Sequence, residues 1–218
     1  MTRTAGRTLH VGLVADSHVG EFLDEIPEAA LEALEGCDLI LHAGDLSVPS
    51  VLDDLGRIAP VVAVRGDHDR LAGLALPETA VVAIARRRIG LVHGDRGRAL
   101  DISVVAASVV AGRSLTYRAG LSGALLRRLG PVDAIVFGHW HEPVSTRMDG
   151  TLLFSPGALC PWGSLQGGAA PRTGAAGVGD RAVRRFRHQL GREAMRPRIG
   201  FLDIDATGIH PSTVAVGH

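Results

Sequence analysis

Apolar and polar positions follow a regular order of segments along the first third of the chain. Residues 9–15, 39–42 and 60–65 are short apolar runs rich in Val, Leu and Ile, which predicts buried strands. Residues 27–35 and 47–55 carry apolar side chains at helical spacing, and Ser47 is a candidate cap for the second helix. This strand–helix–strand–helix–strand order predicts parallel strands with helices on the faces of a sheet.

The rest of the chain is richer in strands. The predicted strands are residues 80–85, 88–93, 132–137, 143–148, 151–154, 199–204 and 212–216. Two hairpins are predicted among them, one around Arg86-Arg87 and one through Asp149-Gly150, which is a strong turn signal. Because these strands outnumber what one sheet usually holds, we expect two packed sheets flanked by helices.

Two further segments are helical or ambiguous. Leu121, Leu125 and Leu129 recur at helical spacing, and Gly130-Pro131 ends that helix. Residues 99–111 are apolar enough for either a buried helix or a strand, and their pattern leaves both open.

Residues 161–198 differ in composition from their surroundings. Their first half is rich in Gly and Ala and predicts a flexible loop, whereas residues 180–196 are basic and have helical spacing. We expect the basic helix to dock on the body of the protein or to be loosely ordered, with a lid or a contact to an anionic partner as the alternative. We therefore predict a single domain over residues 1–218, with a Gly/Arg-rich insertion at about 161–198.

The composition narrows the class of protein. Of the 218 residues, 46% are hydrophobic and only 4% aromatic, so Val, Leu, Ile and Ala must fill the core. The formal net charge of zero gives no overall attraction to nucleic acid or to an anionic membrane. Cys37 and Cys160 are too few for a disulfide scaffold, and no apolar run resembles a signal peptide or a membrane span. We therefore expect a cytoplasmic protein with no membrane partner.

Clusters of Asp and His follow the predicted strands. They are Asp16-Ser17-His18, Gly44-Asp45, Gly66-Asp67-His68-Asp69, His93-Gly94 and Gly138-His139-Trp140-His141. Asp and His side chains at the ends of neighbouring strands can lie close together and form one site. Carboxylate oxygens and imidazole nitrogens together suit a pair of divalent first-row metals.

In this order the clusters resemble the calcineurin-like metallophosphoesterase family, in particular its small bacterial phosphodiesterase branch. The family's series is Asp-x-His, Gly-Asp, Gly-Asn-His/Cys-Asp/Glu, a lone His and Gly-His-x-His, and the resemblance covers roughly residues 9–160 and the last strands. The chain departs from the series at Asp67, where the family has Asn. The resemblance implies an α/β fold, a four-layer αββα sandwich with two packed mixed β-sheets.

The resemblance also implies a ligand set for two divalent metal ions. Asp45 would bridge the ions, Asp16, His18 and His141 would complete the first, and Asp67, His93 and His139 would complete the second. We expect Asp-x-His and His-x-His to be extended segments whose alternate side chains aim at one centre. Mn²⁺ is the first choice of metal, with Fe, Zn, Ni or Mg as alternatives.

His68 and Asp69 are implied to be catalytic. His68 would lie over the phosphate and stabilise the transition state or protonate the leaving oxygen. Asp69 would orient His68 and keep it charged.

The implied activity is a phosphodiesterase that hydrolyses small or nucleotide-type phosphate esters through a bridging hydroxide. A phosphomonoesterase or a protein phosphatase is an alternative, since the metal core does not distinguish them. A non-catalytic scaffold with the same fold is an alternative of another class. The retromer subunit that resembles this branch has lost ligand histidines, whereas this chain keeps His18, His93, His139 and His141.

Other residues near the clusters have structural interpretations. His42 is expected to be a core histidine or to support a ligand. Trp140 is expected to pack at the rim, with stacking on a substrate ring as the alternative. Arg96 and Arg98 are expected in a solvated loop, with contact to a substrate phosphate as the alternative.

Overall fold

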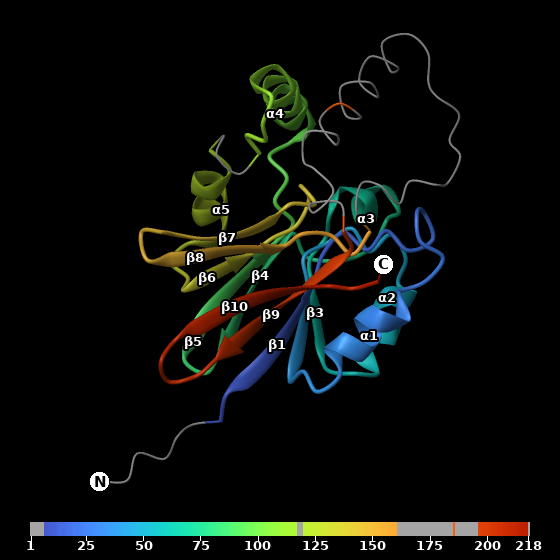
Figure 1. The fold of residues 1–218 in the computed structure, drawn as a ribbon, viewed down its shortest axis with the longest axis vertical. Coiled ribbons are helices and arrows are strands. Elements are labelled where there is room, and N and C mark those ends of the chain that lie inside the picture. Colours follow the sequence, from blue (N-terminus) through green and yellow to red (C-terminus); the bar gives the residue numbers. More distant parts are fainter. Residues whose placement is uncertain (1–6, 117–119, 161–184, 186–195, 218) are drawn as a thin grey trace.

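The computed structural model describes residues 7–116, 120–160, 185 and 196–217, in which ten strands form two five-stranded sheets (Figure 1). The strands are β1 (Leu9–Val14), β2 (Leu39–His42), β3 (Val61–Ala63), β4 (Thr79–Ile84), β5 (Arg87–Val92), β6 (Ala134–Val136), β7 (Pro143–Met148), β8 (Thr151–Pro156), β9 (Arg198–Ile204) and β10 (Ile209–Ala215). The helices are α1 (Glu28–Leu34), α2 (Ser50–Gly56), α3 (Asp67–Leu71), α4 (Arg98–Ala111) and α5 (Leu121–Leu129).

The first sheet has the order β10-β9-β1-β2-β3. Strands β1, β2 and β3 are parallel, with Val14 opposite His42 and His42 opposite Ala63. Strands β9 and β10 complete the sheet in antiparallel register. Because β1 to β3 are parallel, the residues that follow them lie at the same edge of the sheet.

The second sheet has the order β4-β5-β6-β8-β7. Its three central strands, β5, β6 and β8, are parallel, and β4 and β7 pair antiparallel at the two edges. Asp149 and Gly150 join β7 to β8 with positive φ angles of 49° and 85°, as an Asp-Gly hairpin turn requires. The hairpin predicted at this dipeptide is present.

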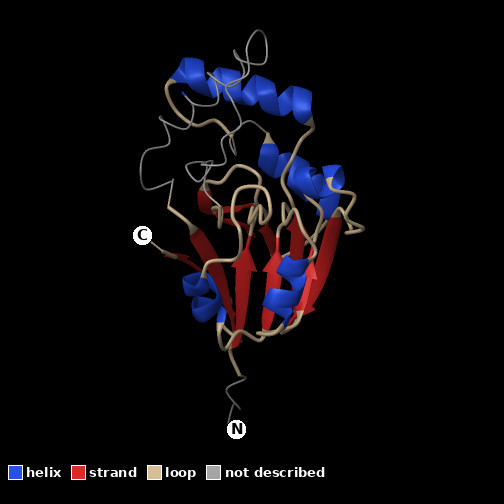
Figure 2. Cartoon of the chain, turned by 90° about the vertical axis from the view of Figure 1, so that its right-hand side faces the viewer, coloured by secondary structure: helices blue, strands red, loops and turns tan. Residues whose placement is uncertain are grey.

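Apolar side chains fill three layers of core between four layers of structure. Leu13 of β1 and Phe154 of β8 belong to the cluster between the two sheets. Leu34 belongs to the cluster that joins α1 and α2 to the first sheet, and Leu125 to the cluster that joins α4 and α5 to the second. The helices lie outside the paired sheets (Figures 1 and 2). The predicted αββα sandwich with two mixed sheets is confirmed.

One local prediction is wrong, one open choice is decided and one helix was not predicted. Helix α2 begins at Ser50, and Ser47 does not cap it because the Ser47 hydroxyl donates to Glu21 Oε2 at 2.9 Å. The ambiguous segment 99–111 is helical and belongs to α4. Helix α3 was not predicted, because five residues are too few to show a helical period.

The predicted insertion at about residues 161–198 lies outside the described residues except for Arg185 and the residues that lead into β9. The single-domain organisation therefore stays a prediction. Within the described part of the chain, no helix has the length and apolar character needed to cross a membrane.

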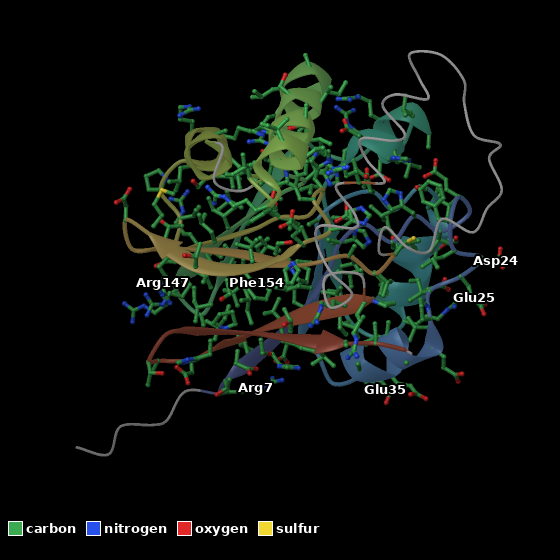
Figure 3. The ribbon with its side chains drawn as sticks, turned by 45° about the horizontal axis from the view of Figure 1, so that its top comes forward. Arg7, Asp24, Glu25, Glu35, Arg147 and Phe154 are labelled. Atoms are coloured by element: carbon green, nitrogen blue, oxygen red, sulfur yellow. The ribbon has the colours of Figure 1, made fainter. Side chains whose placement is uncertain are left out.

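The inter-sheet core gives a test of the packing. Phe154 is fully buried and points into the space between the sheets (Figure 3). Phe154→Ala should lower the free energy of unfolding by ~3–5 kcal/mol, because it leaves a cavity there. Urea titration followed by circular dichroism measures this loss. Val214→Ala, at an exposed position on β10, is the control and should change stability by less than ~0.5 kcal/mol. Equal small losses for both variants would contradict a tightly packed inter-sheet core.

Candidate metal centre

The candidate residues lie where the parallel strands of both sheets end. Asp16 follows β1, Asp45 follows β2, and Asp67 opens α3 after β3. From the second sheet, His93 follows β5 and His139 follows β6. The two sheets therefore present their motif residues at a shared edge, and the predicted convergence occurs.

Two groups of three side chains each place their ligand atoms within 4.8 Å of one another. The first group is Asp16, His18 and His141, and the second is Asp67, His93 and His139. The first group is buried and the second is partly buried. These are the two sets that the motif series assigns to separate ions.

Asp45 lies between the two groups. Its Oδ2 is 3.6 Å from His18 Nε2 and 3.4 Å from His93 Nε2. Its Oδ1 accepts a hydrogen bond of 2.8 Å from the His68 backbone N–H. Two further groups of clustered ligand atoms contain Asp45, one with His18 and His68 and one with Asp16 and His93. One carboxylate is therefore shared by both halves of the site.

Five of the seven proposed ligands have left-handed backbone conformations. They are Asp16 (φ 51°), His18 (φ 47°), Asp45 (φ 58°), His139 (φ 72°) and His141 (φ 54°). The expectation of extended Asp-x-His and His-x-His segments is therefore wrong. Such conformations cost of order 1–3 kcal/mol each and cluster at functional sites. The side chains are aimed by tight turns and not by strand alternation.

Backbone contacts hold these turns together across the two sheets. The N–H of His139 donates to both carboxylate oxygens of Asp16 at 3.0 Å. A Cβ at Gly138 would lie 2.6 Å from Asp16 Oδ2, and a Cβ at Gly66 would lie 2.1 Å from Asp45 Oδ1. The glycines of these two motifs are therefore needed for close approach to the carboxylates.

The ring nitrogens of the second group have defined roles. The Nδ1–H of His93 donates to the carbonyl of Ala43 at 2.9 Å, which leaves Nε2 facing Asp45. His139 Nδ1 lies 3.2 Å from His93 Nε2. A backbone carbonyl that fixes the tautomer of a histidine in this way is common around metal-binding imidazoles.

Burial and mutual charge set the ionisation of the site. Complete burial raises the pKa of Asp16 well above its usual range. Burial also opposes ionisation of Asp45, but His93 and His18 outweigh it and hold the pKa of Asp45 well below its usual range. In turn, Asp45 overcomes the effect of burial and raises the pKa of His93 to about 10. Burial lowers the pKa of His18 and, more strongly, that of His141, which favours the neutral imidazole that binds metals.

His68 is partly exposed beside these groups, and its ring centroid is 4.5 Å from that of His18. The expectation that Asp69 orients His68 is wrong. The buried Asp69 carboxylate accepts hydrogen bonds of 2.8–2.9 Å from the backbone N–H groups of Asp45, Leu46, Ser47 and Gly66. The carboxylate that contacts the His68 ring belongs to Glu21, whose Oε2 lies 2.6 Å from Nδ1.

Sequence reasoning also missed Asp101, whose Oδ2 lies 3.1 Å from His139 Nε2. Burial opposes ionisation of Asp101, but the contact with His139 outweighs it and lowers the pKa of Asp101. The sequence does hold one indication of this role, because Asp101 is the single charged residue in the apolar segment 99–111. Asp101 comes from α4, so this helix helps to hold the second group.

The prediction that Arg96 lies in a solvated loop is wrong. Its side chain is 3% exposed, and its Nε donates to Asp101 Oδ1 at 3.1 Å. Its guanidinium lies 5.2 Å from the ring centroid of Trp140, which is itself buried and edge-on to His139. These contacts favour the packing interpretation of Trp140, and the side chain of Arg98 lies outside the described residues.

His42 supports the site from the core, as predicted. Its Nδ1 accepts from the Gly44 N–H at 3.2 Å, and its Nε2 lies 3.1 Å from Ser17 Oγ. Burial lowers the pKa of His42 to about 3, so the ring is neutral. Both nitrogens are occupied by the loops that carry Asp16 and Asp45.

Comparison with known proteins assigns the family. The sequence profile of the calcineurin-like phosphoesterase superfamily domain matches residues 9–173. The chain belongs to this superfamily. A probable metallophosphoesterase of Methanothermobacter thermautotrophicus is 33% identical over 151 residues, which are 68% of this chain and 76% of that protein. One of Methanocaldococcus jannaschii is 32% identical over 164 residues, 73% of this chain and 75% of that protein. Both relatives are archaeal, so the bacterial branch stays a prediction.

Solved structures with a similar fold align with this chain. Vacuolar protein sorting 29 from Cryptosporidium parvum superimposes with a TM-score of 0.60 at 18% identity, covering 97% of this chain and 99% of that one. A structure described as a novel archaeal phosphodiesterase gives a TM-score of 0.54 at 18% identity and covers 95% and 100%. At these identities the likeness concerns the fold alone.

Asp67 stands where the motif series of this superfamily has Asn, and it has a partner of its own. Arg70 Nη2 donates to Asp67 Oδ1 at 2.5 Å within α3. The other carboxylate oxygen of Asp67, Oδ2, lies 3.9 Å from Nδ1 of His139 in the same group. The additional negative charge of Asp67 is therefore paired with a local positive charge.

The contacts of Asp69 predict a structural defect when it is removed. Asp69→Ala leaves several buried N–H groups without their acceptor, each at a cost of ~1–3 kcal/mol. Thermal denaturation in EDTA should show a large loss of stability without any metal present. Asp53→Ala, at an exposed position of α2, is a matched control and should change stability little. A fully stable Asp69→Ala variant would contradict this structural role.

Proposed function

We propose that this chain is a two-metal phosphoesterase, and specifically a phosphodiesterase that acts on small or nucleotide-type esters. The observation that carries the proposal is the position of Asp45 Oδ2, 3.6 Å from His18 Nε2 and 3.4 Å from His93 Nε2. A carboxylate between two clusters of ligands would be able to contact both ions of a two-metal site.

The residues present fit two divalent ions. Asp16, His18 and His141 would hold one, Asp67, His93 and His139 the other, and Asp45 would contact both. When bound, such ions supply a water nucleophile at neutral pH and neutralise charge on the phosphoryl oxygens. Mixed carboxylate and imidazole ligands make Mn²⁺ our first choice, with Fe, Zn, Ni and Mg as alternatives.

The chain's own residues have separate tasks around this centre. The carbonyl of Ala43 fixes the His93 ring through Nδ1, and the carboxylate of Asp101 fixes the His139 ring through Nε2. His68 is partly exposed, so its ring is available to a bound ester. A hydrogen bond from His68 to a phosphoryl oxygen or to the leaving oxygen would stabilise the transition state.

The assay that tests the proposal compares a chromogenic phosphodiester with the matching monoester. EDTA-treated protein should be inactive, and added Mn²⁺ should restore turnover, with preference for bis(4-nitrophenyl) phosphate over 4-nitrophenyl phosphate. The reverse preference would assign a phosphomonoesterase. No turnover with any of the five candidate metals would contradict the enzymatic proposal and favour a non-catalytic role for the fold.

The shared position of Asp45 predicts how metal content responds to substitution. Asp45→Ala should lose both ions together, because one carboxylate serves both, whereas His93→Ala should mainly lose the second. Elemental analysis of protein equilibrated with Mn²⁺ measures the stoichiometry. Asp24→Ala is the control, since Asp24 lies on the exposed outer surface (Figure 3). Two full equivalents retained by Asp45→Ala would exclude the bridge.

The Asp67–Arg70 pair predicts opposite effects on Mn²⁺ affinity. Asp67→Asn removes a negative charge and should weaken Mn²⁺ binding while it keeps or increases turnover at saturating metal. Arg70→Gln leaves that charge unpaired and should tighten binding by about 1.4–5-fold, since exposed pairs contribute ~0.2–1 kcal/mol. Isothermal titration calorimetry measures both changes. Arg57→Gln removes a comparable i,i+3 pair with Asp54 and should leave Mn²⁺ affinity unchanged. Weaker binding by Arg70→Gln would contradict this charge pairing.

A further inference from the structure

A single oxygen of Glu21 contacts three side chains beside the metal centre. Glu21 Oε2 lies 2.6 Å from His68 Nδ1, 2.9 Å from Ser47 Oγ and 3.4 Å from His18 Nδ1. The contact with His68 is the shortest. Because an ionised carboxylate only accepts hydrogen bonds, this contact places a proton on His68 Nδ1 and leaves Nε2 as the nitrogen for a substrate.

The loop that carries Glu21 is fixed by its own backbone. The N–H of Val19 donates to the carbonyl of Leu46 at 3.2 Å, and the N–H of Gly20 donates to that of Leu23 at 2.7 Å. The Glu21 N–H donates to the carbonyl of His18 at 3.2 Å. The carboxylate of Glu21 is therefore presented by a tight turn that directly follows the Asp16-x-His18 motif.

Ser47 joins Glu21 to the rest of the site. Its hydroxyl donates to Glu21 Oε2, while its backbone N–H donates to Asp69 Oδ1 at 2.9 Å. Since Asp69 is the neighbour of His68 in α3, the contacts form a closed ring from His68 through Glu21, Ser47 and Asp69. A closed ring of this kind defines one position for the imidazole relative to the loop of Asp45.

We infer that Glu21 is the positioning residue for His68 in the proposed phosphoesterase reaction. Glu21 fixes the ring orientation and keeps a proton on Nδ1, so that Nε2 faces a bound ester and donates to it once the ring carries its second proton. Asp69 acts only indirectly, because its two oxygens are taken by backbone N–H groups. This role rests on the proposed function, and it differs from any role through His18, whose contact with Glu21 is longer at 3.4 Å.

A double-mutant cycle with His68 tests the role in catalysis. Glu21→Ala should lower kcat by ~10–100-fold, the range for carboxylates that orient a functional histidine, with KM and Mn²⁺ content unchanged. Glu21→Gln keeps an acceptor oxygen and should recover much of this loss. In a His68→Ala background, Glu21→Ala should have almost no further effect, because residues that act as one unit are not additive. Glu25→Gln is the control, because Glu25 is a nearby exposed side chain (Figure 3), and its kcat should equal that of the unsubstituted protein.

Two kinetic outcomes would overturn the inference. One is an equal loss from Glu21→Ala with and without His68, which would show that Glu21 acts elsewhere. The other is a loss of Mn²⁺ affinity in Glu21→Ala that accounts for the whole fall in kcat, which would assign Glu21 to His18 and its metal.

A spectroscopic readout decides the geometry without any activity. Two-bond ¹H–¹⁵N correlation spectra should show the Nδ1–H tautomer of the neutral His68 ring. The signals of this ring are assigned as those that disappear from the spectrum of His68→Ala. Glu21→Ala should convert the Nδ1–H tautomer to a mixture of tautomers, and Glu25→Gln should not. An Nε2–H tautomer in the unsubstituted protein would overturn the inference. The expected tautomer in a protein that hydrolyses no ester would instead sink the proposed function and leave the Glu21–His68 contact established.

Discussion

The buried carboxylate of Asp69 is the interaction on which the site depends. Four backbone N–H groups, from the loops after β2 and β3, donate to its two oxygens. Hydrogen bonds to an ionised acceptor are about twice as strong as hydrogen bonds between neutral groups. In these loops they take the place of the strand-to-strand backbone hydrogen bonds, which stop where β2 and β3 end. They hold Asp45 in a left-handed conformation and place its side chain between the two ligand groups. The shared carboxylate is thus positioned by a second carboxylate that has no chemistry of its own.

A side chain with two tasks also joins the two sheets. Asp16 receives the backbone N–H of His139, so one side chain both belongs to a ligand group and closes the loop that carries another ligand. His42 is tied to the loops of Asp16 and Asp45 through its two nitrogens. Strain in the left-handed residues is therefore balanced locally, by contacts between loops, while the layers of apolar core lie below them.

Much of this could be predicted from the sequence, for reasons that can be named. Apolar runs mark β1 and β2 closely, and the Asp or His that ends each parallel strand must lie at a shared edge. Local conformation could not be predicted in the same way, since no period exists in a turn of three residues. Glu21 and Asp101 were missed because each belongs to no motif and meets its histidine only through the fold. Asp69 was misassigned because its neighbour in sequence, His68, suggested a contact that the backbone amides had already taken.

The arrangement of the two sheets has a consequence for the order in which the protein matures. Asp16 and His139 meet across 123 residues, and β1 is paired on one side with β9, close to the end of the described chain. Contacts of such long sequence separation form late in folding. A chain synthesised only as far as the end of β5 has the Asp residues of both ligand groups but lacks His93, His139 and His141. A chain would then bind metal with full affinity only after its last strands have joined the two sheets. Because bound ions stabilise the state that binds them, they would shift the equilibrium from partly folded chains to fully folded ones.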